Sequence, residues 1–125
     1  MTRSLRVLAG ANAYRTLRAE GLRSDLFRLL VGASGGPKWL VLSGLDRALA
    51  TGWLAGSGRE APLSMLGSSI GAWRLACHAM ADPVAALDRF LDAYLAQRYT
   101  SKPPPAEVSA VSEGILRQML GAAGA

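Results

Sequence analysis

Two glycine-rich turns, each between a short apolar run and a helical pattern, constrain the fold of this chain more than any other feature. The first turn, residues 32–37, follows the apolar run at 26–31, and Pro37 is well placed as the first residue of a helix. The second turn, residues 67–71, follows the run at 62–66 and precedes another helical stretch. Two strand-turn-helix units in succession predict an α/β fold with a parallel sheet.

Helical patterns account for most of the remaining sequence. Apolar residues recur at three-to-four spacing in five segments, which are residues 7–20, 37–49, 72–80, 83–99 and 106–120. Asp82, followed by Pro83, is the expected cap of the fourth of these helices. A stiff Pro-rich linker at 102–105 precedes the last one, and residues 56–60 form a polar loop.

The number of predicted strands bears on domain organisation. A parallel sheet that is buried on both faces needs more than two strands, yet only helical patterns follow the second turn. We therefore expect residues 1–125 to be the N-terminal part of a longer domain. The motif-bearing core of this part spans residues 26–99.

The second turn reads Gly67-Ser68-Ser69-Ile70-Gly71, which is the Gly-x-Ser-x-Gly pattern of a nucleophile elbow. Such a strand-to-helix turn forces its serine into a strained conformation, and the flanking glycines let the chain pack tightly around it. The following helix presents its N-terminus to the same spot, which favours negative charge there. We predict that Ser69 is a nucleophile, with Gly67 and Gly71 supporting the turn.

The first turn contains Gly35 and Gly36, two small residues whose backbone N–H groups can converge on an anion. Turns at the carboxyl ends of adjacent parallel strands would place these amides beside Ser69, so we predict that they form an oxyanion hole. Lys38 either helps to hold the anion or covers the sheet edge with its stem. Residues 32–36 also match Gly-x-Ser-x-Gly, which makes Ser34 the competing nucleophile.

Together the two motifs resemble those of the patatin-like phospholipases. Gly35-Gly36-Pro37-Lys38 is similar to the oxyanion element of that family, and the turn around Ser69 is similar to its nucleophile elbow. The resemblance covers about residues 26–99. It implies a three-layer α/β fold and a Ser-Asp dyad that hydrolyses acyl esters of phospholipids or related lipids, without histidine, metal or cofactor.

The chain departs from the family pattern in two places. Its first turn opens with Gly-Ala-Ser at 32–34, where the family has an acidic residue and several glycines. The family's catalytic aspartate belongs to an Asp-Gly motif, and no Asp-Gly occurs in these 125 residues. Asp82 is expected to cap a helix, and Asp88 and Asp92 fall on a solvated helix face. We therefore expect the catalytic aspartate of the dyad to lie beyond this chain. We expect the chain on its own to be inactive.

Other reactive side chains have structural explanations. His78 lies nine residues after Ser69 on the same predicted helix, ~13 Å along its axis, so it cannot complete a triad. It is expected to be a partly buried helix residue. Cys77 is expected to be a small buried hydrophobe. The three tryptophans are expected to pack in or beside the core, and they are Trp39, Trp53 and Trp73.

The charge and the single cysteine suggest partners and a compartment. The chain has 14 Lys and Arg against 9 Asp and Glu, a net charge of +5 that suits an anionic membrane surface as well as plain solvation. The basic residues are scattered, which disfavours nucleic acid. With one cysteine and an apolar run at 7–11 too short for a signal peptide, we expect a cytoplasmic protein whose membrane contact, if any, is peripheral.

A phosphate-binding or nucleotide-binding module is the alternative to an enzyme, because helix N-termini after Gly-rich turns also hold phosphates. Neither the Gly-x-Gly-x-x-Gly nor the Gly-x-x-x-x-Gly-Lys fingerprint is present. Hydrolysis and acyl transfer stay open as reaction outcomes, because both proceed through the same acyl-enzyme.

Overall fold

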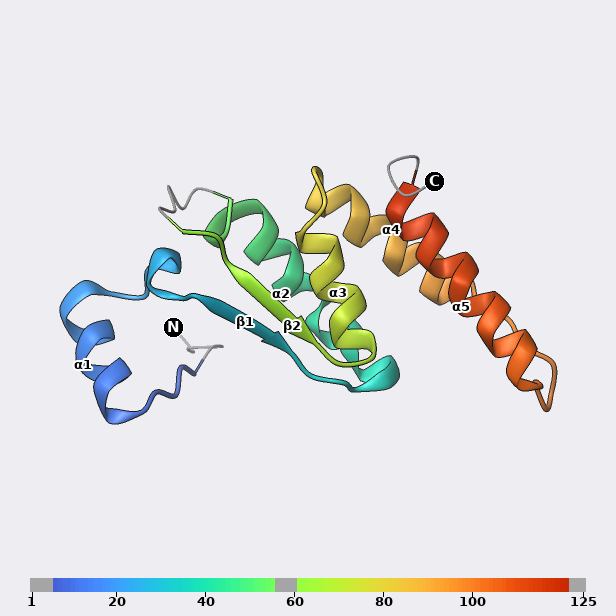
Figure 1. Ribbon diagram of the computed structural model, residues 1–125, viewed down its shortest axis with the longest axis horizontal. Coiled ribbons are helices and arrows are strands. Elements are labelled where there is room, and N and C mark those ends of the chain that lie inside the picture. The colour runs from blue at the N-terminus through green and yellow to red at the C-terminus, as the bar shows by residue number, and fades with distance from the viewer. Residues whose placement is uncertain (1–5, 56–60, 122–125) are drawn as a thin grey trace.

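A computed structural model describes residues 6–55 and 61–121 (Figure 1). Within these residues the chain is α/β, and the loop predicted at 56–60 lies outside them. In chain order the main elements are α1 (Ala11–Glu20), β1 (Leu29–Gly32), α2 (Ser43–Ala48), β2 (Ser64–Gly67), α3 (Ile70–His78), α4 (Pro83–Ala96) and α5 (Pro105–Leu120).

The two strands pair in parallel, in a register that runs from Leu29 with Ser64 to Gly32 with Gly67. This confirms the predicted parallel sheet. Helix α3 packs on both strands, and Figure 1 shows α2 and α3 alongside them with α4 and α5 beyond. The side chains that point to the opposite face, those of Leu29, Val31 and Leu66, are 50%, 62% and 61% exposed. The continuous apolar run of the first strand predicted burial on both faces. This prediction was wrong, because one face of the strand is exposed.

The hydrophobic core lies between the helices and is built around aromatic rings. Phe90 of α4 is fully buried and stacks on Trp39, with ring centroids 4.6 Å apart. Trp73 of α3 is tilted against Phe90, with ring centroids 5.9 Å apart. Ile115 and Met119 bring α5 into the same cluster. The predicted core roles of Trp39 and Trp73 are thus confirmed.

The leading helix is shorter than the sequence pattern predicts. Gly10 is extended, with φ −67° and ψ 163°, so α1 begins at Ala11 and the prediction was wrong for residues 7–10. Gly21, with a φ of 80°, ends the helix. Helix α1 has no buried residue and lies beyond the start of β1 in Figure 1, apart from the other helices. Trp53 packs near this end, edge-on against Phe27.

Both strands also begin later than their apolar runs. Ser24–Leu26 forms a 3-10 turn, which delays β1 to Leu29 although the run begins at Leu26. Similarly, β2 begins at Ser64 and not at residue 62. Each strand ends at the first glycine of its turn.

The segment after the first turn is helical, but it is not the single α-helix predicted over 37–49. It begins as a 3-10 helix over Gly36–Leu42, in which Pro37 takes an early position, and becomes α-helical only in α2. A π-helical turn, Leu49–Trp53, ends it. Tight 3-10 geometry is frequent at helix N-termini, where the first N–H groups have no intrahelical partner.

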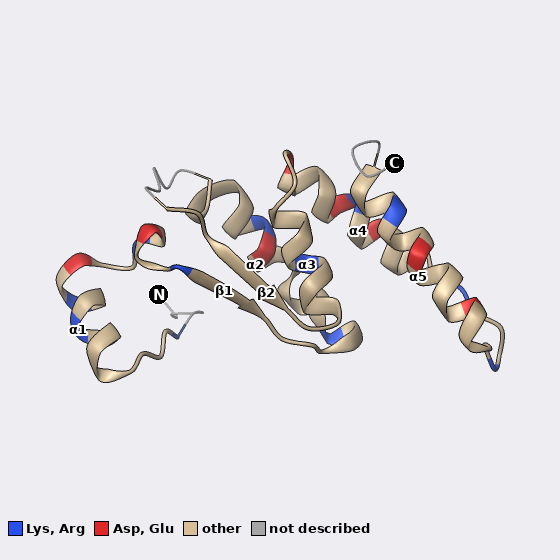
Figure 2. Cartoon of the chain, in the orientation of Figure 1, with Lys and Arg blue, Asp and Glu red and all other residues tan. Residues whose placement is uncertain are grey.

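The last two helices follow the prediction closely. Asp82 is the N-cap of α4, and its carboxylate accepts a hydrogen bond of 2.9 Å from the Ala85 N–H, which confirms the predicted cap. Helix α4 ends at Ala96, three residues before the predicted end. Helix α5 already begins at Pro105, so the linker is shorter than predicted. Figure 2 shows basic and acidic residues distributed along the helices, with both strands free of charge.

Candidate active site

Ser69 lies in the turn between β2 and α3, at the N-cap position of α3. Its backbone has φ 52° and ψ −130°, and among the described residues it is the one non-glycine with a positive φ. A conformation of this kind costs on the order of 1–3 kcal/mol and persists only where the surrounding structure holds it. Ser69 is exposed, so this strained turn presents the residue at the surface, as expected of a nucleophile elbow.

Glycines hold the turn in place because there is no room for a side chain. A Cβ at residue 71 would lie 2.3 Å from the Gly32 carbonyl oxygen, and one at Gly67 would lie 2.3 Å from the Cα of Ala72. The Ser68 N–H donates a 3.0 Å hydrogen bond to the Gly32 carbonyl. The first turn of α3 therefore rests directly on the end of β1.

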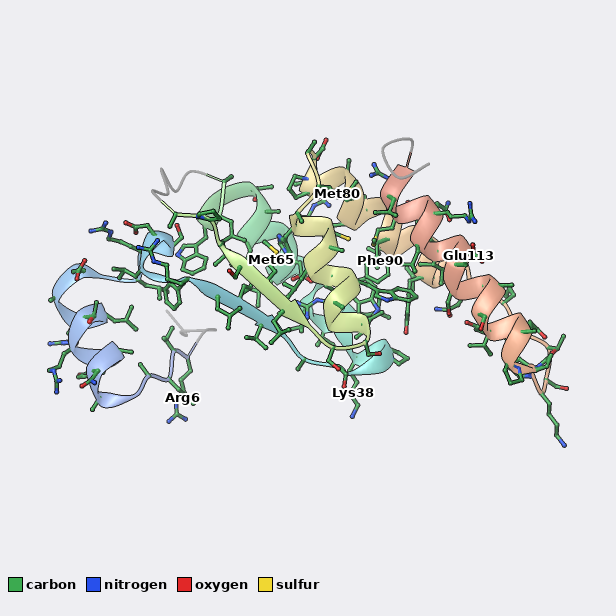
Figure 3. The ribbon with its side chains drawn as sticks, in the orientation of Figure 1. Arg6, Lys38, Met65, Met80, Phe90 and Glu113 are labelled. Carbon is green, nitrogen blue, oxygen red and sulfur yellow. The ribbon has the colours of Figure 1, made fainter. Side chains whose placement is uncertain are left out.

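The first glycine turn has an open backbone. Gly35 has φ −171° and ψ 1°, Gly36 has a φ of 51°, and both are exposed. The Lys38 N–H donates to the Gly35 carbonyl at 3.2 Å. The Lys38 side chain is exposed and points away from the strands (Figure 3), so its stem does not cover the sheet edge. Ser34, in the same loop, lacks the positive φ of an elbow.

Strand pairing brings the two turns to one end of the sheet. Gly32 and Gly67 are the last paired residues of β1 and β2, and both chains leave the sheet there in the same direction. The turn with Gly35 and Gly36 and the turn with Ser69 therefore lie at the carboxyl ends of adjacent parallel strands, where open α/β sheets place ligands.

The three aspartates considered as bases have other surroundings. Asp82 caps α4. Asp88, about half exposed, pairs with Arg47 of α2, and one of its two hydrogen bonds measures 3.0 Å. Asp92 is exposed on α4. The structure gives none of them a place in the turn around Ser69.

His78 and Cys77 lie at the far end of α3 and are buried. The His78 side chain is 1% exposed and its Nε2 lies 3.4 Å from Oδ1 of Asp46, which confirms a buried helix residue in place of a triad member. Cys77 is fully buried. Burial raises the pKa of its thiol to about 12, so it is the small hydrophobe that was predicted.

The sequence did not predict the buried polar cluster that Asp46, Arg74 and His78 form. The Arg74 guanidinium donates from Nε and Nη2 to the two carboxylate oxygens of Asp46, at 2.7 and 2.6 Å. Burial alone would raise the pKa of Asp46, but the hydrogen bonds from His78 and Arg74 and the Arg74 charge outweigh it and hold this pKa below its ordinary value. The sequence did carry a signal, since both charged residues lie on the apolar stripes of their helices.

Other kinds of site have little support in the described part of the chain. It contains no group of three His, Cys, Asp or Glu side chains that could hold a metal ion. None of its helices has the length and apolar character needed to cross a membrane. A pocket of about 220 Å³ lies between α2 and α4, and its lining residues are Trp39, Ser43, Gly44, Arg47, Leu87, Asp88 and Leu91. It is formed by neither glycine turn.

Comparison of the chain with protein-family models, with curated proteins and with solved structures found no match.

Proposed function

We propose that this chain carries the front part of a serine acyl hydrolase of the patatin-like type, with Ser69 as the nucleophile. The observation that carries the proposal is the backbone of Ser69, which has φ 52° and ψ −130° between a strand and a helix. A positive φ at a serine is uncommon, and strained residues cluster at active sites. The neighbouring turn with Gly35 and Gly36 supports the same proposal, since it lies at the same end of the sheet.

The reaction follows from the roles of the two turns. The Ser69 Oγ bonds to the carbonyl carbon of an acyl ester, while its proton passes to the carboxylate base. The N–H groups of Gly35 and Gly36 stabilise the negative charge that develops on the carbonyl oxygen. The C–O bond to the alcohol then breaks, and the alcohol takes the proton. Water, or another hydroxyl, attacks the acyl-serine in the second half and releases Ser69.

The base and the substrate class rest on the family resemblance. The base is expected to be the aspartate of an Asp-Gly motif, which these 125 residues do not contain. The substrate is expected to be a lipid ester. The net charge of +5 supports this, because phospholipid surfaces are anionic. We also expect residues 1–125 expressed alone to hydrolyse esters at a negligible rate.

A fluorophosphonate probe tests the proposal in the full-length protein. The probe should label the wild type and the Ser34→Ala variant at similar rates, whereas Ser69→Ala should abolish labelling. Labelling that survives in Ser69→Ala would show that another residue attacks. An unlabelled wild type that binds a nucleoside triphosphate saturably would favour the phosphate-binding alternative.

A further inference from the structure

A contribution to folding stability does not explain why Asp46, Arg74 and His78 form a buried polar cluster. Asp46 is 1% exposed, Arg74 is 8% exposed, and Arg74 forms a two-pronged pair with both carboxylate oxygens at 2.6 and 2.7 Å. Taking two charges out of water costs nearly as much as their attraction returns, so apolar residues of similar volume would hold the helices together equally well. What such a pair does provide is a fixed geometry, because the planar guanidinium donates to a carboxylate in only a few orientations.

The cluster joins the two helices that follow the two turns. Asp46 lies in α2, which continues the 3-10 helix that begins at Gly36. Arg74 lies in α3, five residues after Ser69. Helix α2 packs on α4, α3 packs on α4 and the sheet, and the 3-10 segment before α2 also contacts α3. The ion pair adds a direct side-chain link between α2 and α3.

His78 contacts the Asp46 carboxylate from the same face of α3 as Arg74 does. Its Nε2 lies 3.4 Å from Oδ1 of Asp46, and within the described residues its buried Nδ1 has no hydrogen-bond partner. Oδ1 therefore faces both Arg74 and His78, one helical turn apart on α3. Two contacts from one helix restrict the sliding and rotation of the carboxylate along it.

We propose that Asp46, Arg74 and His78 are positioning residues, which set the distance between the oxyanion turn and the nucleophile by locking α2 to α3. The proposal rests on the function proposed above. It predicts that the pair matters for the rate of attack by Ser69 more than for folding. A displacement of about 1 Å at reacting atoms can reduce a rate by up to ~100-fold.

The test separates geometry from stability in the full-length protein. The double variant Asp46→Leu/Arg74→Met replaces the cluster's ion pair by apolar side chains and should unfold at the wild-type denaturant concentration or higher. Its maximal rate of labelling by a fluorophosphonate probe should fall on the order of 10- to 100-fold, with little change in the probe concentration that gives half the maximal rate. The matched control, Arg47→Met/Asp88→Leu, removes the exposed ion pair between α2 and α4 and should label at the wild-type rate.

Two further measurements keep the outcome clear. Arg74→Lys keeps the charge and loses the two-pronged geometry, so it should also label slowly even if the double variant does not fold. Backbone amide NMR shifts of Gly36 and Ser69 should move in Arg74→Lys and stay in place in the control. Wild-type labelling rates together with unmoved shifts in a folded cluster variant would overturn the positioning role. If the wild type is not labelled but the Gly36 and Ser69 amide shifts still move in Arg74→Lys, only the proposed function is overturned.

Discussion

Gly71 in the first turn of α3 lies against Gly32 at the end of β1, and a Cβ on either residue would come within 2.7 Å of the other's carbonyl oxygen. The contact is between two backbones, so no flexible side chain can move away to make room. This contact sets how closely the first turn of α3 packs on the end of β1. Ser69, with its positive φ, lies two residues earlier in the same turn.

Gly71→Ala should therefore be strongly destabilising. Overpacking a dense contact costs about 1–3 kcal/mol, and here the added methyl group meets backbone atoms only. The free energy of unfolding, measured with urea, checks this prediction. Gly114→Ala in α5 is the control, because its Cβ would meet nothing within 4 Å and should stabilise the helix by about 0.5–1 kcal/mol. Equal losses in both variants would contradict the close approach.

Ser69→Gly should make the protein more stable. Relief of the positive φ returns on the order of 1–3 kcal/mol, of which the greater backbone freedom of glycine offsets about 0.5–1 kcal/mol. Ser69→Ala keeps a Cβ at the same φ of 52° and should not gain this stability. Thermal unfolding of the two variants side by side measures the difference. A variant with glycine that melts below the one with alanine would argue against strain at this turn.

The free energy of unfolding should fall in acid, partly because Asp46 becomes protonated. Its pKa is lowered in the folded state, so the unfolded chain binds this proton first as the pH drops. The stabilisation is complete above the ordinary value of 3.8 and is lost as the pH falls below it. Asp46→Asn should cost about 3–5 kcal/mol at pH 7, because it leaves Arg74 buried without its charge partner.

Urea unfolding of wild type and Asp46→Asn between pH 7 and pH 3 checks the sign. The gap between the two proteins should narrow toward pH 3, since other carboxylates contribute equally to both. A gap that stays constant over this range would show that Asp46 titrates normally.

Asp82→Ala should destabilise α4 at its start. The carboxylate of Asp82 accepts the Ala85 N–H at 2.9 Å, and removal of such a cap costs about 1 kcal/mol. Asp92→Ala, at an exposed position of the same helix, should change the stability by less than about 0.5 kcal/mol. Chemical denaturation of both variants provides the comparison, and a loss of similar size in the two would remove the cap as its cause.

Cys77 should resist alkylation in the folded protein. Its thiol is fully buried, and its pKa of about 12 leaves almost no thiolate at pH 8. Reaction with a thiol reagent such as iodoacetamide should be slow in buffer and fast in 6 M guanidinium chloride. Rapid reaction in buffer would mean that α3 opens often.

Local signals predicted the features that depend on neighbouring residues. The cap at Asp82 and the turn around Ser69 each follow from a few consecutive residues, and the structure has both where the sequence places them. Element boundaries were less predictable. Gly10 stays extended although apolar residues surround it. Pro37 lies in the first turn of a 3-10 helix, whose apolar pattern over one turn resembles that of an α-helix.

The polar cluster was not predictable because its pairing is non-local. Asp46 and Arg74 are 28 residues apart, and no spacing rule relates residues on two different helices. Each was nevertheless unusual in its own helix. Asp46 shares a face with Leu42 and Leu49, and Arg74 shares one with Ile70 and Cys77, so a charged residue on each apolar stripe indicates that a buried partner exists.

The register of the sheet has a consequence for folding kinetics. Leu29 pairs with Ser64, 35 positions later, whereas α4 and α5 pack together across a short connection. Closing the longer loop costs more entropy, so the helical hairpin should form early and the strand pair late. Because Ser69 follows β2 directly, its positive φ should be fixed only when the strands have met. A refolding chain should therefore regain most of its helical circular dichroism before the elbow exists.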